Sequence, residues 1–226
     1  MSIDLHAHTD ASDGSLSPTK LVELAVQQKL TVLGITDHDT IYGWDEAFAA
    51  GEKLGVEIVP GVELSTSYAG GRFHLLGYYV NPNSELIHVL ERIQTARRNR
   101  NGEILENLRE LGVPLEESEV RAFAGENGQL GRPHFAQAMI RRGYVATTQE
   151  AFDKYLADGQ PAYATKAVLS PQEAIGLIHD AGGVSIWAHP PLNRNFTLQQ
   201  LEEKLAEWKS WGLDGIETFY SRYTPE

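Results

Sequence analysis

The segment Asp4–Gly14, DLHAHTDASDG, is the stretch from which the fold class is inferred. His6 and His8 stand two residues apart after a short apolar start, a pattern typical of a strand. Residues two apart in a strand point to the same face, so we expect the two imidazoles side by side. Histidine nitrogens suit zinc, manganese and iron. Asp13 follows on a Ser-Asp-Gly turn, where its carboxylate can reach back to the strand end.

The same combination of an apolar run and polar, ligand-type residues recurs along the chain. TVLGIT (31–36) leads directly into Asp37-His38-Asp39, and GVSIWA (183–188) leads into His189. In a barrel of alternating strands and helices, chemistry gathers at the carboxyl ends of the strands. The alternation itself favours an α/β fold with a mainly parallel sheet.

The periodicity predicts the other elements as well. Strands are expected over 2–8, 31–36, 56–59, 73–80, 183–188 and 214–219. Helices are expected from Ser17-Pro18 onward and over 44–54, 84–111, 133–142, 148–157, 171–181 and 197–211. We interpret 81–165 as a helical insertion into a discontinuous barrel formed by 1–80 and 166–226.

Composition and charge narrow the class of protein. The chain of 226 residues carries a net charge of −12 and contains no cysteine. An acidic surface repels duplex DNA, since nonspecific binding depends on Lys and Arg neutralising phosphates. Segment 81–165 holds 10 of the 19 basic and 12 of the 31 acidic residues, so it is nearly neutral. An anionic substrate is therefore expected to bind near this segment rather than near the more acidic remainder. No run is long and apolar enough to span a membrane, and the cytoplasm is the expected location.

Seven side chains at or near predicted strand ends are candidate metal ligands: His6, His8, Asp13, His38, Glu63, His74 and His189. Taken singly, each has an ordinary alternative. A histidine at a strand end is usually hydrogen-bonded, Glu63 can be a solvated loop charge, and Asp37 and Asp39 can cap the helix that follows Thr40. Their joint occurrence favours a metal site. Seven ligands exceed the needs of one cation, and paired metals recur in phosphatases and nucleases.

Together with ITDHDT (35–40), PGVELS (60–65), FHLLGY (73–78), GRPHFA (131–136) and WAHPP (187–191), these motifs resemble the polymerase and histidinol phosphatase (PHP) family. The likeness extends over essentially the whole chain. It is narrowest to bacterial members that act as 3',5'-nucleoside bisphosphate phosphatases and 5'-3' exoribonucleases. The resemblance implies a distorted, seven-stranded β/α barrel with a helical insertion and a trinuclear metal centre.

The resemblance also implies roles for individual residues. It distributes the ligands over three positions: His6, His8 and Glu63; then Glu63, as a bridge, with His74 and His189; and finally Asp13 with His38. Two to three divalent metals are expected, Mn²⁺ first, with Zn²⁺, Fe²⁺ or Mg²⁺ as alternatives.

On the substrate side, the resemblance implies that Arg132 and His134 face the substrate. His134 would protonate the leaving oxygen or position a phosphate. Lys166 and Arg194 are further phosphate-binding candidates, and Asp37 would orient a metal ligand. The alternative for Arg132 is a surface charge at a helix start.

One family motif is absent. A Gly-Ser-Asp-x-His sequence, expected on the last strands, does not occur after Glu217. We therefore expect that the C-terminal β/α units are missing and that the first and third metal positions each lack one ligand.

These features predict a metal-dependent phosphoesterase that acts on a small phosphorylated nucleotide or a short single-stranded RNA end. Two alternatives stay open at this point. One is a non-catalytic metal-binding module. The other is carbon–nitrogen hydrolysis, as in amidohydrolases, which share the His-x-His start but often bridge their metals through a carboxylated lysine.

Overall fold

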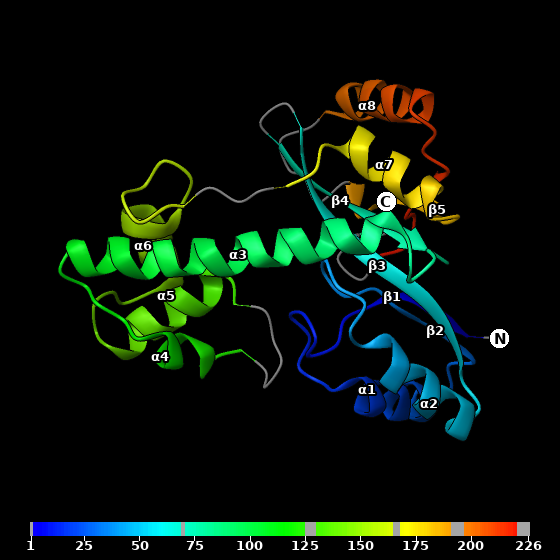
Figure 1. The fold of residues 1–226 in the computed structure, drawn as a ribbon, viewed down its shortest axis with the longest axis horizontal. Coiled ribbons are helices and arrows are strands. Elements are labelled where there is room, and N and C mark those ends of the chain that lie inside the picture. The colour runs from blue at the N-terminus through cyan, green and yellow to red at the C-terminus, as the bar shows by residue number, and fades with distance from the viewer. Residues whose placement is uncertain (1, 69–70, 125–129, 165–167, 191–196, 221–226) are drawn as a thin grey trace.

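A computed structural model describes residues 2–68, 71–124, 130–164, 168–190 and 197–220. The described residues form one sheet, curled into a half-barrel, whose strand order follows the sequence (Figure 1). Its strands are β1 (Ile3–Ala7), β2 (Val32–Ile35), β3 (Glu57–Tyr68), β4 (Gly71–Tyr78), β5 (Val184–Ala188) and β6 (Gly215–Ile216). The α/β class predicted from the sequence is confirmed.

The prediction of a mainly parallel sheet is wrong for its centre. β1, β2 and β3 are mutually parallel, as are β5 and β6, but β4 runs antiparallel to both β3 and β5. Only two residues separate β3 from β4. A parallel pair needs a crossover of about a dozen residues, whereas a hairpin needs about two. The hairpin also extends β3 far beyond the predicted end at Val59, so Glu63 lies inside this strand and not in a loop.

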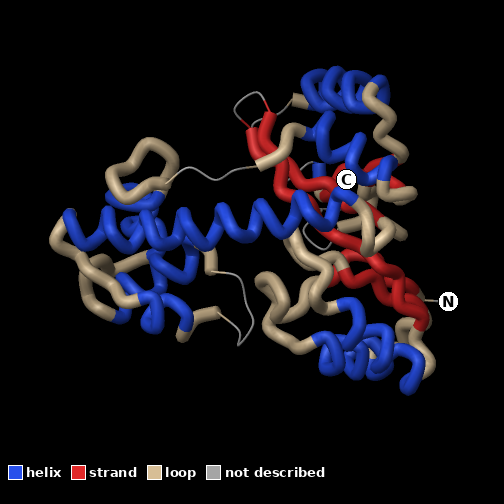
Figure 2. The backbone as a smooth tube through the Cα atoms, viewed as in Figure 1, coloured by secondary structure: helices blue, strands red, loops and turns tan. Residues whose placement is uncertain are grey.

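Some of the described helices cover the outside of the sheet, and others lie away from it (Figure 1). Those described are α1 (Pro18–Gln27), α2 (Trp44–Leu54), α3 (Glu85–Glu110), α4 (Glu117–Arg121), α5 (Arg132–Arg141), α6 (Thr148–Ala151), α7 (Pro171–Asp180) and α8 (Leu198–Ser210). α1 and α2 lie together at one end of the sheet, and α7 and α8 lie at the other (Figures 1 and 2). Ser17 caps α1 and Ser170 caps α7, each ahead of a proline in the first turn, as the sequence predicts.

α3 is the long helix that leads away from the sheet to α4, α5 and α6 (Figure 1). Ile104 and Leu108, near its far end, pack in an apolar cluster with Phe135 and Met139 of α5. The sheet and its covering helices have a separate core. The division into a discontinuous barrel and the insertion 81–165 remains an interpretation, and these two cores support it.

Three elements differ in detail from the expectation. α4 is not predicted, because five residues are too few to show a helical period. The helix predicted over 148–157 is the short α6 followed by a π-helical turn (Phe152–Leu156). The predicted strand over 214–219 pairs only through Gly215 and Ile216.

An aromatic cluster fixes α8 against the sheet. Trp208 is fully buried, with its ring centre 4.2 Å from that of Trp187 on β5 and 5.1 Å from that of Phe73 on β4. Such pairs add to the free energy gained by burying the rings themselves.

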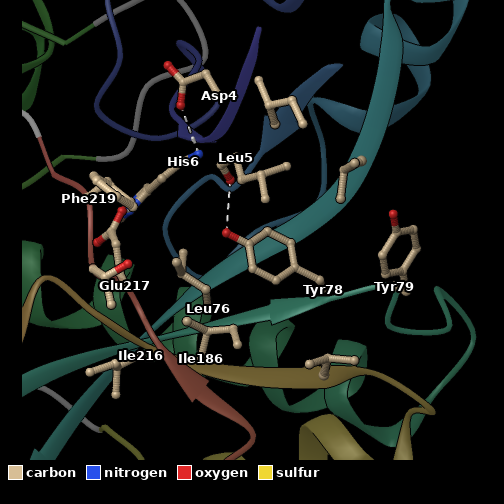
Figure 3. Close-up of a pocket in the computed structure, with 14 residues that line it drawn as sticks. Asp4, Leu5, His6, Leu76, Tyr78, Tyr79, Ile186, Ile216, Glu217 and Phe219 are labelled. Carbon is tan, nitrogen blue, oxygen red and sulfur yellow. Dashed lines mark hydrogen bonds and ion pairs between the residues drawn. The ribbon is translucent and has the colours of Figure 1, made fainter. Parts of the chain in front are cut away.

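The edge strands β1 and β6 border an apolar hollow of about 530 Å³ (Figure 3). Leu76, Ile186 and Ile216 line it, and the Tyr78 hydroxyl donates a hydrogen bond across it to the Leu5 carbonyl, at 2.9 Å. This hollow explains why Leu5 is 42% exposed. Within the described part of the chain, no helix is long and apolar enough to cross a membrane.

Candidate metal centre

Glu63 is the centre of the site. Its side chain is 1% exposed, and among the described residues five imidazoles approach its two carboxylate oxygens. Oε1 lies 2.9 Å from His74 Nδ1 and 2.9 Å from His189 Nε2. Oε2 lies 3.2 Å from His6 Nε2, 3.0 Å from His8 Nε2 and 3.3 Å from His38 Nδ1. The structure thus brings together six of the seven predicted ligands around one buried carboxylate.

The sheet produces this convergence because each ligand comes from a neighbouring strand. His6 lies on β1, Glu63 on β3 and His74 on β4, while His38 and His189 follow the ends of β2 and β5. The backbone around His38 pairs with β3, with the Glu63 N–H donating to the Asp37 carbonyl at 3.1 Å. The imidazoles form a closed ring, with centre-to-centre separations of 4.7–5.7 Å between neighbours.

Asp13, the seventh predicted ligand, reaches the same site from the loop after β1. Its carboxylate lies 3.1 Å from His8 Nδ1 and 3.7 Å from His38 Nε2, and its side chain is 58% exposed. Gly14 permits the turn, since a Cβ atom there would lie 2.3 Å from the His8 carbonyl oxygen. Asp13 therefore lies at the solvent side of the histidine ring.

Asp37 holds this loop in place. Its buried carboxylate accepts hydrogen bonds from the Thr9 N–H and hydroxyl, both at 2.7 Å, and from the Ser12 hydroxyl at 2.5 Å. These hydrogen bonds fix the loop between His8 and Asp13. The alternative that Asp37 and Asp39 cap the following helix is wrong, because α2 begins at Trp44 after Gly43 and has no side-chain cap.

Asp39 connects the site to α3. It is fully buried, accepts hydrogen bonds from the Ser65 N–H at 2.8 Å and hydroxyl at 3.0 Å, and pairs with Arg97 of α3. Its backbone φ is +52°, and that of His189 is +35°. Both values lie in or near a region that non-glycine residues rarely adopt, and such strain is often found at functional sites.

Glu217 belongs to the site although the sequence reasoning did not assign it. Its Oε1 accepts a hydrogen bond from His6 Nδ1 at 3.0 Å, and the two side chains lie next to each other in Figure 3. Its Oε2 accepts a hydrogen bond from the His189 backbone N–H at 2.8 Å. A carboxylate behind a ligating histidine fixes the ring and raises its basicity. The available signal was its place beyond the apolar start of the last predicted strand, the position that singled out the other ligands.

The carboxylates determine the protonation of the ring. Burial lowers the pKa of His6 and His8, but bonds and charges from Glu217, Glu63 and Asp13 outweigh it and raise the pKa to about 9 and about 10. Burial lowers the pKa of His38 to about 4. Burial would raise the pKa of Glu63, but the surrounding histidines hold that pKa well below its usual range. Without a cation, the centre therefore carries protons on His6 and His8, which metal binding would have to displace.

The donor set fits divalent cations. His6 Nε2 and His8 Nε2 lie 3.1 Å apart and both face Glu63, so two ring nitrogens point at the same space. Among the described residues, two groups of three bring their ligand atoms within 4.8 Å of one another: His6, Glu63 and His189, and His8, His38 and Glu63. Glu63 is common to both, as a bridging carboxylate would be. Mixed imidazole and carboxylate ligands suit Zn, Mn and Fe.

The predicted substrate residues Arg132 and His134 lie on α5, outside the ring of histidines. Arg132 Nη1 donates to the Leu156 carbonyl and to Asp158, both at 2.8 Å, and its side chain is 12% exposed. His134 Nδ1 accepts a hydrogen bond from the Gly131 N–H at 3.1 Å. Burial lowers the pKa of His134, and the charge of Asp13 opposes this effect. Lys166 and Arg194 lie outside the described residues.

Comparison with known proteins agrees with this geometry. The chain is 37% identical over 215 residues to a 5'-3' exoribonuclease of Haemophilus influenzae, covering 95% of this chain and 77% of that protein. It is 32% identical to the 3',5'-nucleoside bisphosphate phosphatase of Chromobacterium violaceum, covering 95% and 75%. A crystal structure from Bifidobacterium adolescentis, assigned as a metal-dependent phosphoesterase, superposes with a TM-score of 0.84 at 32% identity, covering 100% of this chain and 79% of that one.

The family model of the PHP domain matches residues 4–158. This range includes β1 to β4, which carry most of the histidine ring, and the helices α3 to α5. The family predicted from the sequence motifs is confirmed, and with it the phosphoesterase fold. The chain belongs to the PHP domain family.

Proposed function

We propose that this protein is a metal-dependent phosphoesterase that acts on nucleotides. The proposed reaction is removal of the 3'-phosphate from nucleoside 3',5'-bisphosphates, 5'-3' release of nucleotides from short RNA, or both. The observation that carries the proposal is the buried Glu63 carboxylate between five imidazole nitrogens. The names of the two relatives, an exoribonuclease and a bisphosphate phosphatase, support the substrate class.

We infer that two cations would be held by Glu63, one together with His6 and His8 and the other together with His74 and His189. The support for this grouping is that His6 and His8 face Oε2 of Glu63, whereas His74 and His189 face Oε1. Asp13 and His38 would contribute to a third position. Mn²⁺ is the first candidate, with Zn²⁺, Fe²⁺ or Mg²⁺ as alternatives. When bound, such ions supply Lewis-acid polarisation of the phosphoryl group and a source of activated water at neutral pH.

His134 is suited to bind substrate through Nε2. Its Nδ1 accepts a hydrogen bond from a backbone N–H, so the neutral ring carries its proton on Nε2. Because burial lowers its pKa, the ring is neutral at pH 7 and donates a hydrogen bond without charge. Of the two expected roles, positioning of a phosphate is better supported than protonation of the leaving oxygen.

Asp37 and Glu217 would act by positioning other groups. Asp37 holds the loop that carries Asp13, through its bonds to Thr9 and Ser12. Glu217 holds the His6 ring and the His189 backbone. A preorganised ligand shell reduces the cost of ordering groups during the reaction.

Product analysis tests this proposal. Incubation of adenosine 3',5'-bisphosphate with the protein and Mn²⁺ should yield adenosine 5'-monophosphate and inorganic phosphate, separable by ion-exchange chromatography. A 5'-phosphorylated RNA of a few nucleotides, in parallel, should yield mononucleotides from its 5' end if the exonuclease activity is present. Turnover of neither substrate would refute the proposed substrate class.

The same assay separates the alternatives. Tight metal binding without turnover would indicate a non-catalytic metal-binding module. Release of ammonia from amide substrates would indicate carbon–nitrogen hydrolysis. Glu63, a carboxylate, is the residue common to both groups of candidate ligands, which favours the phosphoesterase over an amidohydrolase with a carboxylated lysine.

A further inference from the structure

Two arginines converge on one carboxylate next to the candidate metal centre. Arg72 Nη2, on β4, lies 2.8 Å and 2.9 Å from the two oxygens of Asp158. Arg132 Nη1, at the start of α5, lies 2.8 Å from one of the same oxygens. Asp158 thus occupies a position at which a doubly charged anion would find two guanidinium groups.

Arg72 is directed toward the metal centre by the register of the hairpin. It stands two residues before His74 on β4, so the two side chains lie on the same face of the strand. Their partners on β3 are Ser67 and Ser65. An anion held by Arg72 would therefore lie on the same side of the sheet as a group held at His74.

A cavity joins the two positions. Arg72, His74, Asp158 and Tyr163 line one partly open space of about 240 Å³. This volume is below the range of about 300–1,000 Å³ that holds drug-sized ligands, so the cavity suits one end of a nucleotide rather than the whole molecule. Arg72 and His74 also line the neighbouring hollow that contains His189.

The side chains of the two arginines differ in their contacts and their exposure to solvent. Arg132 is held between the rings of Phe152 and Tyr163, at 5.6 Å and 5.3 Å from their centres. Arg72 is 53% exposed and Asp158 is 62% exposed, so their ion pair is open to exchange with a solvent anion. An exposed pair of this kind contributes little to stability, typically about 0–1 kcal/mol.

Further positive charge lies close by. Burial, followed by the charges of Arg97, Arg132 and Arg72, lowers the pKa of Arg100 to about 10. The charges of three arginines therefore act on Arg100, although the chain as a whole is acidic.

We propose that Arg72 is a specificity-determining residue that binds the non-scissile phosphate of the substrate, and that Asp158 occupies its guanidinium until this phosphate displaces it. The inference rests on the proposed phosphoesterase function and adds the basis on which a bisphosphate is preferred over a monophosphate. A carboxylate in the anion position makes entry competitive, so a doubly charged phosphate displaces it more readily than a singly charged or neutral group.

Steady-state kinetics of three variants test the assignment: Arg72→Gln, Asp158→Asn and, as a matched control, Arg121→Gln. Arg121 is 48% exposed and pairs with Glu117 on α4 at 2.7 Å, so it reproduces the loss of an exposed ion pair. The substrates are adenosine 3',5'-bisphosphate and adenosine 3'-monophosphate, which share the scissile group but differ in the second phosphate.

Arg72→Gln should raise KM for the bisphosphate about tenfold, the loss of one charge-assisted hydrogen bond, with a much smaller effect on kcat. The effect on KM for the monophosphate should be several times smaller. Asp158→Asn should change KM for the bisphosphate in the opposite direction, a decrease of about threefold, because it removes the competing carboxylate. Arg121→Gln should match the parent.

An increase in KM for the bisphosphate in one variant and a decrease in the other is a result that a merely structural ion pair would not give. If Arg72→Gln and Asp158→Asn both raise KM, or if both substrates respond equally, the assignment of Arg72 is wrong while the phosphoesterase proposal stands. If the parent protein hydrolyses neither substrate, the proposed function fails first, and the inference fails with it.

Discussion

Replacement of Glu217 by glutamine should weaken metal binding without removing any proposed ligand. The two oxygens of Glu217 have separate donors, the His6 ring at 3.0 Å and the His189 N–H at 2.8 Å. A glutamine has one oxygen and one NH₂ group, so one donor keeps an acceptor and the other meets a second donor. The side chain of Glu217 is 11% exposed, so water cannot readily compensate.

The size of the effect follows from one lost hydrogen bond to a charged group, about 1.5–3 kcal/mol. This corresponds to a loss of about 10- to 100-fold in affinity, the range typical of residues that support metal ligands. Calorimetric titration of chelator-treated protein with Mn²⁺ measures it directly. Glu207→Gln is the matched control, because Glu207, on α8, accepts a hydrogen bond at 2.6 Å from the hydroxyl of Tyr68, the last residue of β3. Equal affinities for Glu217→Gln and the control would refute the account of His6 and His189.

Three further predictions concern stability and the loop. In the presence of chelator, the pKa values of His6 and His8 are raised to about 9 and about 10, so protonation of these rings stabilises the folded state. This contribution is complete below about pH 6.5 and is lost as the pH rises through 9 to 10. The free energy of unfolding in urea should therefore be lower at pH 10.5 than at pH 7, and equal values would contradict the prediction. Trp208→Ala should destabilise the protein by about 3–5 kcal/mol, measured by thermal denaturation, because the ring is fully buried; a loss below 1 kcal/mol would show that α8 is not anchored there. Gly14→Ala should lower Mn²⁺ affinity about tenfold while circular dichroism stays unchanged, because the new Cβ lies 2.3 Å from the His8 carbonyl and must move the turn that carries Asp13; unchanged affinity would place Asp13 outside the metal centre.

Local patterns were sufficient to predict most elements. Ser17 and Ser170 ahead of prolines marked the starts of α1 and α7, and the 44–54 helix ends before Gly55, whose φ is +74°. The two-residue spacing of His6 and His8 predicted neighbouring imidazoles, and their nitrogens lie 3.1 Å apart. These signals are carried by residues close together in the chain, so a single sequence contains them.

Features that depend on tertiary contacts were harder to predict from the sequence. The antiparallel β4 results from the short β3–β4 connection, whereas the strand–helix alternation of the rest favoured parallel pairing. Glu217 is 211 residues from His6, and no local pattern relates them. The Arg72–Asp158 pair joins a strand of the sheet to the segment that follows the π-helical turn, so its position could be recognised only from the structure.

Phosphate release from adenosine 3',5'-bisphosphate as a function of added Mn²⁺ tests the central claim most directly. The comparison is between chelator-treated parent protein, Glu63→Gln and the control Glu207→Gln. The account predicts that the parent and the control gain activity in step with bound metal and that Glu63→Gln stays inactive, because it loses the carboxylate on which five imidazoles converge. Activity that is independent of added metal, or full activity in Glu63→Gln, would contradict it.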